Sequence, residues 1–103
     1  MKSNTAKRAH FIIEHVKKIL VQQFNPSLIY LFGSRAKSEN KMGSDFDFAL
    51  EMKKPDAKTL NDLIYQINRV SGLHHVDLIF LKSIEHEFRT IVEETGKIIY
   101  EKK

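Results

Sequence analysis

Three aspartates and one glycine–serine pair are the residues whose types and spacing could do chemistry in this chain. Gly33-Ser34 ends an apolar run, and after ten further residues Asp45 and Asp47 follow on a segment in which polar and apolar residues alternate. Aspartates at positions i and i+2 of a strand project from one face, so their carboxylates can converge on a hard cation. Mg²⁺ is favoured, because it binds through one or two carboxylates and completes its shell with water and substrate phosphates.

Asp77 is the third acid of interest, because it interrupts the apolar segment Val76–Leu81. Burying an unpaired carboxylate in such a strand is costly. If the two acid-bearing strands are neighbours, Asp77 joins Asp45 and Asp47 in one cluster whose repulsion a metal would relieve. Two simpler readings stay open. Paired acids also occur on solvated strand faces, and Asp77 could be an edge-strand charge that discourages aggregation.

Gly33-Ser34 has the features of a phosphate-binding site. A glycine after a strand lets a phosphate approach the backbone closely, and the start of a following helix offers free N–H groups. The Ser34 hydroxyl can add a hydrogen bond to a phosphate oxygen. Arg35 could supply positive charge, or it could be a solvated helix residue.

The elements that must position these residues alternate along the chain. Helical spacing of apolar residues predicts helices over 9–24, from Asp56 to Ser71-Gly72, and from Ser83 to Thr95-Gly96, with Asp56 and Ser83 as N-caps. Ser34 could cap a short helix over 35–38, followed by a polar surface loop over 38–44. Strands are expected over 28–32, 45–52, 76–81 and 98–100. This alternation predicts one α/β (α+β) domain spanning residues 1–103, with helices packed on a mixed sheet of about four strands.

The second predicted strand has two faces of different character. Phe46, Phe48, Leu50 and Met52 fall on one face and are expected in the core. The opposite face, with Asp45, Asp47, Ala49 and Glu51, is expected outside it. The five apolar residues Leu28–Phe32 do not alternate, which predicts a strand buried on both faces.

The composition limits the partners, the types of site and the cellular location expected for this chain. The net charge of +4 and pI near 9.4 suit polyanionic partners, but they are also common in small domains for solubility. With no cysteine, disulfides and thiolate metal sites are excluded. No apolar run approaches the length of a membrane span or signal peptide, so a cytoplasmic protein is the simplest expectation. The sequence does not match the Walker, EF-hand or dinucleotide-binding motifs. His74 and His75 are expected in a loop before a strand.

The two-part motif is similar to a known signature. Gly33-Ser34, ten residues, and Asp45-x-Asp47 resemble the GSx10DxD pattern of the nucleotidyltransferase superfamily, whose fold is shared with the palm of DNA polymerase beta. The surrounding LFGSRA…GSDFDFAL, the later VDLIFL and the closing GKIIYE resemble the minimal nucleotidyltransferase family. This resemblance implies that Gly33 and Ser34 hold the nucleotide's phosphates, while Asp45, Asp47 and Asp77 form the metal-binding triad.

The resemblance also implies a reaction and a partner. Family members of this size are commonly antitoxins paired with a HEPN-domain ribonuclease toxin, and some transfer AMP from ATP to a tyrosine of that toxin and silence it. A hetero-oligomer with the toxin is therefore expected. One Mg²⁺ held by Asp45, Asp47 and Asp77 would activate the acceptor hydroxyl, and a second, held by Asp45 and Asp47, would neutralise the leaving pyrophosphate, the two ions lying roughly 3.5–4 Å apart. Asp77 could also take the hydroxyl proton.

Two other functions remain open at this stage. The chain could neutralise the toxin by binding alone, without catalysis. It could also transfer a nucleotide to RNA or a small molecule, although it shows no second domain to grip such a substrate. Direct binding to nucleic acid or membrane is not expected.

Overall fold

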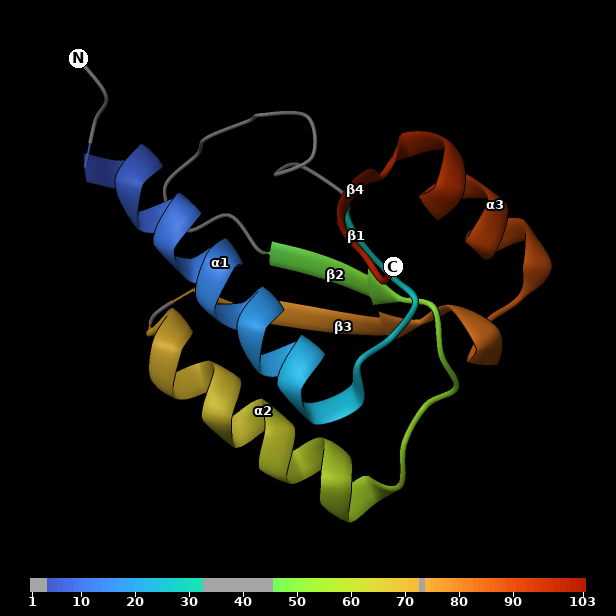
Figure 1. Cartoon of the computed structure of the whole chain (residues 1–103), viewed down its shortest axis with the longest axis horizontal. Coiled ribbons are helices and arrows are strands. Elements are labelled where there is room, and N and C mark those ends of the chain that lie inside the picture. Colours follow the sequence, from blue (N-terminus) through green and yellow to red (C-terminus); the bar gives the residue numbers. More distant parts are fainter. Residues whose placement is uncertain (1–3, 33–45, 73) are drawn as a thin grey trace.

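A four-stranded mixed sheet forms the centre of the molecule in the computed structural model, which describes residues 4–32, 46–72 and 74–103 (Figure 1). Its strands are β1 (Leu28–Phe32), β2 (Phe46–Leu50), β3 (Val76–Phe80) and β4 (Lys97–Glu101). The order across the sheet is β3-β2-β1-β4. β1 pairs antiparallel with β2 and with β4, whereas β2 and β3 are parallel. The predicted mixed α/β architecture is confirmed.

In the described part of the chain, three helices cover the sheet. They are α1 (Asn4–Phe24), α2 (Ala57–Ser71) and α3 (His86–Thr95), and a short 3₁₀ turn, η1 (Leu81–Ser83), precedes α3. α1 and α2 run side by side on one face, and α3 lies apart from them beside β1 and β4 (Figure 1). The predicted first helix is confirmed and begins five residues earlier than expected. The short helix predicted at 35–38 and the loop at 38–44 lie outside the described residues.

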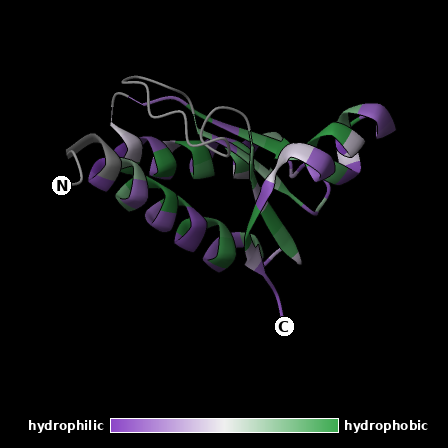
Figure 2. Cartoon of the chain, turned by 90° about the horizontal axis from the view of Figure 1, so that it is seen from above, coloured by the Kyte–Doolittle hydropathy of each residue, from purple (hydrophilic) through white to green (hydrophobic). Residues whose placement is uncertain are grey.

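The main core lies between the sheet and the α1–α2 layer. Its fully buried members include Ile12, Val16, Leu20, Phe46 and Phe48. Hydrophobic and hydrophilic residues form stripes along both helices (Figure 2), as expected for helices with one face against a sheet. The prediction that Phe46, Phe48 and Leu50 anchor their strand in the core is therefore confirmed.

A second, smaller core lies under α3. Tyr30, Ala49, Leu81 and Val92 are buried together there. The prediction that the whole polar face of β2 lies outside the core is wrong at Ala49, which is fully buried. The reason is that α3, more than thirty residues later in the chain, covers this end of the face.

Helix ends follow the predicted chemistry, with one exception. The Asp56 side chain accepts a hydrogen bond from the Thr59 N–H at 2.7 Å and caps α2. Gly72 ends α2 with a φ of 63°, a conformation that favours glycine. The prediction that Ser83 caps α3 is wrong: the helix begins at His86, and the Ser83 hydroxyl instead accepts a hydrogen bond from the Lys54 N–H.

β3 is an edge strand. The sequence predicts a buried strand over 76–81, but only Phe80 of β3 is buried, and the other residues of the strand are half-buried. One edge of β3 therefore faces away from the sheet, which is compatible with a charged residue such as Asp77.

Candidate active site

Two of the three candidate aspartates, Asp47 and Asp77, lie side by side on neighbouring strands. Phe32 of β1 pairs with Asp47 of β2, and Asp47 pairs in turn with Asp77 of β3. Paired residues in a sheet project to the same face, and adjacent strands are about 4.8 Å apart. The prediction that the two acid-bearing strands are neighbours is confirmed, because the register places Asp47 and Asp77 in direct apposition.

In the sequence, the glycine–serine pair directly follows Phe32, the β1 residue of this row. β1 ends at Phe32, immediately before Gly33-Ser34, and β2 begins at Phe46, immediately after Asp45. Gly33, Ser34, Arg35 and Asp45 themselves lie outside the described residues, and their predicted roles stay predictions. The described strand ends nevertheless show that this segment joins two antiparallel neighbours, of which β2 carries Asp47.

His75 is a contact of Asp77 that sequence reasoning missed. Its Nε2 lies 2.7 Å from Asp77 Oδ1, and its backbone carbonyl accepts a hydrogen bond from the Phe46 N–H at 2.9 Å. The side chains of His75 and Asp77 are 65% and 49% exposed. The one available signal was spacing, since residues two apart in an extended chain share a face.

The chemistry of these donors fits a hard divalent cation. Asp47 is half-buried and makes contacts of its own, and Asp77 presents a second carboxylate from the next strand. Two adjacent carboxylates repel each other, and oxygen ligands are those that Mg²⁺ prefers. Within residues 4–32, 46–72 and 74–103, no group of three or more His, Asp or Glu is placed to hold a metal ion. The described acids would therefore be only part of a ligand set, to which Asp45 is predicted to belong.

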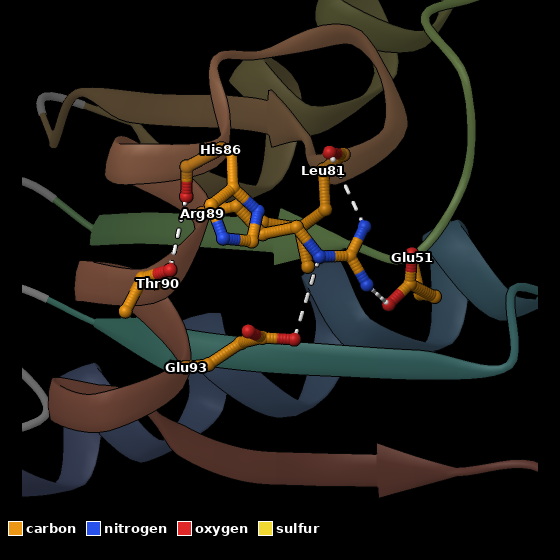
Figure 3. A network of polar contacts seen from close by, with 6 residues as sticks. All are labelled: Glu51, Leu81, His86, Arg89, Thr90 and Glu93. Atoms are coloured by element: carbon orange, nitrogen blue, oxygen red, sulfur yellow. Dashed lines mark hydrogen bonds and ion pairs between the residues drawn. The ribbon is translucent and has the colours of Figure 1, made fainter.

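The other end of the same sheet face carries a charged network that holds α3. Arg89 of α3 bonds to Glu51 through Nη2, and its Nη1 donates to the Leu81 carbonyl at 3.4 Å (Figure 3). Its Nε lies 3.4 Å from Glu93. The hydrogen bond to Glu51 raises the pKa of Arg89 above its ordinary value, which is already high enough to keep the guanidinium charged. Burial, together with Glu93 and Glu51, raises the pKa of the nearby Tyr30 hydroxyl.

The family follows from a match over most of the chain. Residues 14–103 match the family model described as "Polymerase beta, Nucleotidyltransferase". This chain belongs to that family. The mixed sheet with an acid on each of two adjacent strands is thus a nucleotidyltransferase domain, and the predicted family resemblance is confirmed.

Two relatives of this nucleotidyltransferase carry similar assignments. A Haemophilus influenzae protein named "Probable protein adenylyltransferase MntA" is 32% identical over 89 residues, covering 85% of this chain and 78% of its own. A Methanocaldococcus jannaschii protein, MJ1379, is also assigned as a protein adenylyltransferase; it is 35% identical over 80 residues, covering 75% of this chain and 79% of its own.

Solved structures share the fold of this nucleotidyltransferase. A toxin–antitoxin crystal structure with AMP-PNP aligns with a TM-score of 0.73 at 26% identity, covering 87% of this chain and 73% of that one. A complex of a tri-AMPylated Shewanella oneidensis HEPN toxin with its MNT antitoxin aligns with a TM-score of 0.69 at 23% identity, covering 90% of this chain and 72% of that one.

In the part of this chain that the structure describes, no helix has the length and apolar character to cross a membrane.

Proposed function

We propose that this chain is an antitoxin that transfers AMP from ATP to a tyrosine of a HEPN-domain ribonuclease toxin and thereby neutralises it. The observation that carries the proposal is the direct pairing of Asp47 with Asp77 on one sheet face. Membership of the nucleotidyltransferase family supports the reaction type. The relatives assigned as protein adenylyltransferases, and the complexes of HEPN toxins with MNT antitoxins, support the acceptor and a hetero-oligomer with it.

The residues divide the chemistry between them. Asp47 and Asp77, together with Asp45, would hold two Mg²⁺ ions. When bound, Mg²⁺ neutralises charge on the triphosphate and lowers the pKa of the acceptor hydroxyl. Asp77 accepts the tyrosine proton while the tyrosine oxygen forms its bond to the α-phosphorus. The bond from the α-phosphorus to the bridging oxygen breaks, and pyrophosphate leaves.

The glycine–serine segment would bind the rest of the nucleotide. Gly33 and Ser34 are proposed to hold phosphate oxygens through backbone N–H groups and the serine hydroxyl, and Arg35 to add positive charge. Their place in the chain supports this, since they follow Phe32, the residue that pairs with Asp47.

The proposal is tested by labelled-ATP transfer to the protein encoded next to this chain. Asp47→Asn and Asp77→Asn should each lower transfer at least about 100-fold, because each removes a charged oxygen ligand at the reacting phosphate. Asp62→Asn, at an exposed position on α2, is the matched control and should leave transfer unchanged. Chelation with EDTA should abolish transfer, and added Mg²⁺ should restore it.

Three results would contradict the proposal. Transfer that survives both Asp47→Asn and Asp77→Asn would exclude these acids from the reaction. Full protection of cells by Asp47→Asn would assign neutralisation to binding alone. Equal labelling of RNA or a small molecule without the protein partner would assign a different acceptor.

A further inference from the structure

α3 and the start of β4 leave an apolar patch exposed on the sheet face that carries the acids. Ile91 is 55% exposed, Ile98 50% and Phe88 39%. Phe88 and Ile91 are three residues apart, so they lie on one side of α3. Ile98 pairs with Tyr30, whose side chain is buried beneath α3, so Ile98 projects to the same face of the sheet. Exposed apolar groups gathered in this way mark interaction sites.

The patch is flanked by acidic side chains. Glu87, Ile91 and Glu94 follow each other at intervals of four and three residues, which places Ile91 between the two glutamates on one stripe of the helix. Among the described residues, neither Glu87 nor Glu94 belongs to an ion pair. Residues 84–95 contain four glutamates and one arginine, a net charge of −3. Since the whole chain carries +4, the remainder carries +7, and the acidity of this segment, which is α3 and the two residues before it, stands out locally.

The patch borders the candidate active site. The rings of Phe88 and Phe32 meet edge to face with their centroids 6.3 Å apart. Phe32 in turn pairs with Asp47, and both project to the α3 face of the sheet. A molecule seated on α3 is therefore placed one side chain away from the row of acids.

We propose that α3 and Ile98 form the docking surface for the acceptor protein, which presents arginine or lysine side chains around an apolar contact. This rests on the proposed function, because that function requires a protein substrate whose hydroxyl reaches Asp47 and Asp77. Opposite charge on the acceptor steers it to the acidic helix, and the apolar centre supplies most of the affinity.

A surface groove elsewhere on the molecule does not place a bound acceptor within reach of Asp47 and Asp77. It is lined by α1 residues, including Lys17, Lys18 and Val21, and by Tyr100 of β4. Tyr100 packs against the α1–α2 core, so this groove lies on the opposite side of the sheet from the acids. A protein held there would be separated from Asp47 and Asp77 by the sheet itself.

The test is binding of the protein encoded next to this chain, measured by calorimetry in an Asp47→Asn background so that no modification occurs. Ile91→Asp should weaken binding more than about tenfold, because it places a charge at the apolar centre of the interface. Glu94→Lys should do the same, because it sets a positive charge against the cationic side chains of the acceptor. Tyr65→Asp, at a 67% exposed aromatic on α2, and Asp62→Lys are matched controls and should change the Kd less than about twofold.

In the catalytically intact chain, the same α3 substitutions should leave the KM for ATP unchanged. Far-ultraviolet circular dichroism checks that each variant folds. If Ile91→Asp does not fold, Ile98→Ser takes its place as the test of the apolar patch.

Three results overturn the docking surface. Unchanged binding by the α3 variants, or equal weakening by the α2 controls, places the interface elsewhere. A raised KM for ATP in Ile91→Asp with unchanged partner binding assigns Ile91 to the nucleotide. The two proposals fail separately. AMP transfer that α3 substitutions leave intact refutes only the docking surface, whereas α3-dependent binding without AMP transfer refutes only the proposed reaction.

Discussion

Replacing Arg89 with methionine tests whether the charged network under α3 holds that helix on the sheet. Arg89→Met keeps most of the apolar stem but removes the guanidinium, which bonds to Glu51, Glu93 and the Leu81 carbonyl. The Glu51 side chain is only 13% exposed, and its Oε2 is buried without a hydrogen-bond partner among the described residues. The variant therefore leaves a mostly buried carboxylate without its cation.

The expected cost lies between two limits. Removing one partner of a fully buried ion pair costs about 3–5 kcal/mol, whereas an exposed pair contributes about 0–1 kcal/mol. Because the Arg89 side chain is 26% exposed, solvent screens part of the interaction. We therefore expect Arg89→Met to lower the free energy of unfolding by about 2 kcal/mol. For a domain of this size that corresponds to a fall in Tm of about 10 °C.

The assay is thermal and urea unfolding of a double-mutant cycle. Glu51→Gln removes the buried charge, so adding it to Arg89→Met should recover about half of the loss, roughly 1 kcal/mol. Glu93→Gln is the matched control, since it removes the charge of the more exposed partner and should cost less than about 0.5 kcal/mol. Two results would refute the reasoning: a cost for Arg89→Met no larger than that for Glu93→Gln, or no coupling between Glu51→Gln and Arg89→Met.

Three further predictions concern other parts of the chain. Gly96→Ala should lower the free energy of unfolding by about 2 kcal/mol in urea titrations, because the added Cβ would lie 2.6 Å from the Val92 carbonyl oxygen and 3.3 Å from Tyr30 Cβ. Hydrogen bonds from Thr59 hold the pKa of Asp56 below its ordinary 3.8, so this charge contributes stability above pH 3.8 that is lost as pH falls through the lower folded value. The Tm values of wild type and Asp56→Asn should therefore differ above pH 3.8 and converge only when the pH lies below the lowered pKa of the folded state. His75→Ala should lower AMP transfer about tenfold and raise the Mg²⁺ concentration needed for half-maximal transfer, since it removes the group that orients Asp77, while His10→Ala should change neither.

Local pattern was enough to predict the strands that carry the acids. Alternation in FDFAL assigns Phe46 and Phe48 to the core and Asp47 to the other face, and both assignments hold. The position of Asp77 beside Asp47 followed only conditionally from the residues, because strand pairing depends on how the intervening helix crosses the sheet. The likeness of the motifs to a known superfamily supplied what the periodicity could not.

Contacts between distant residues account for what the sequence did not reveal. Glu51 looked like a solvated strand residue, because its partner Arg89 lies 38 residues later on a helix whose position no local pattern specifies. Ser83 had the right chemistry for a helix cap, but the Lys54 N–H competes for its hydroxyl. In both cases a long-range partner decided the role of a residue whose type allowed several.

The parallel pairing of β2 with β3 also bears on when the protein becomes active. Asp47 and Asp77 are separated by the whole of α2, so their strands can pair only once the connection through that helix has closed. Closing such a long connection is slow compared with forming a hairpin. A chain that has emerged from the ribosome only as far as α2 contains Asp47 but not the strand that completes the acid pair. The proposed antitoxin activity is therefore absent from incomplete or partly folded chains, and protection of the cell would begin only once this crossover is finished.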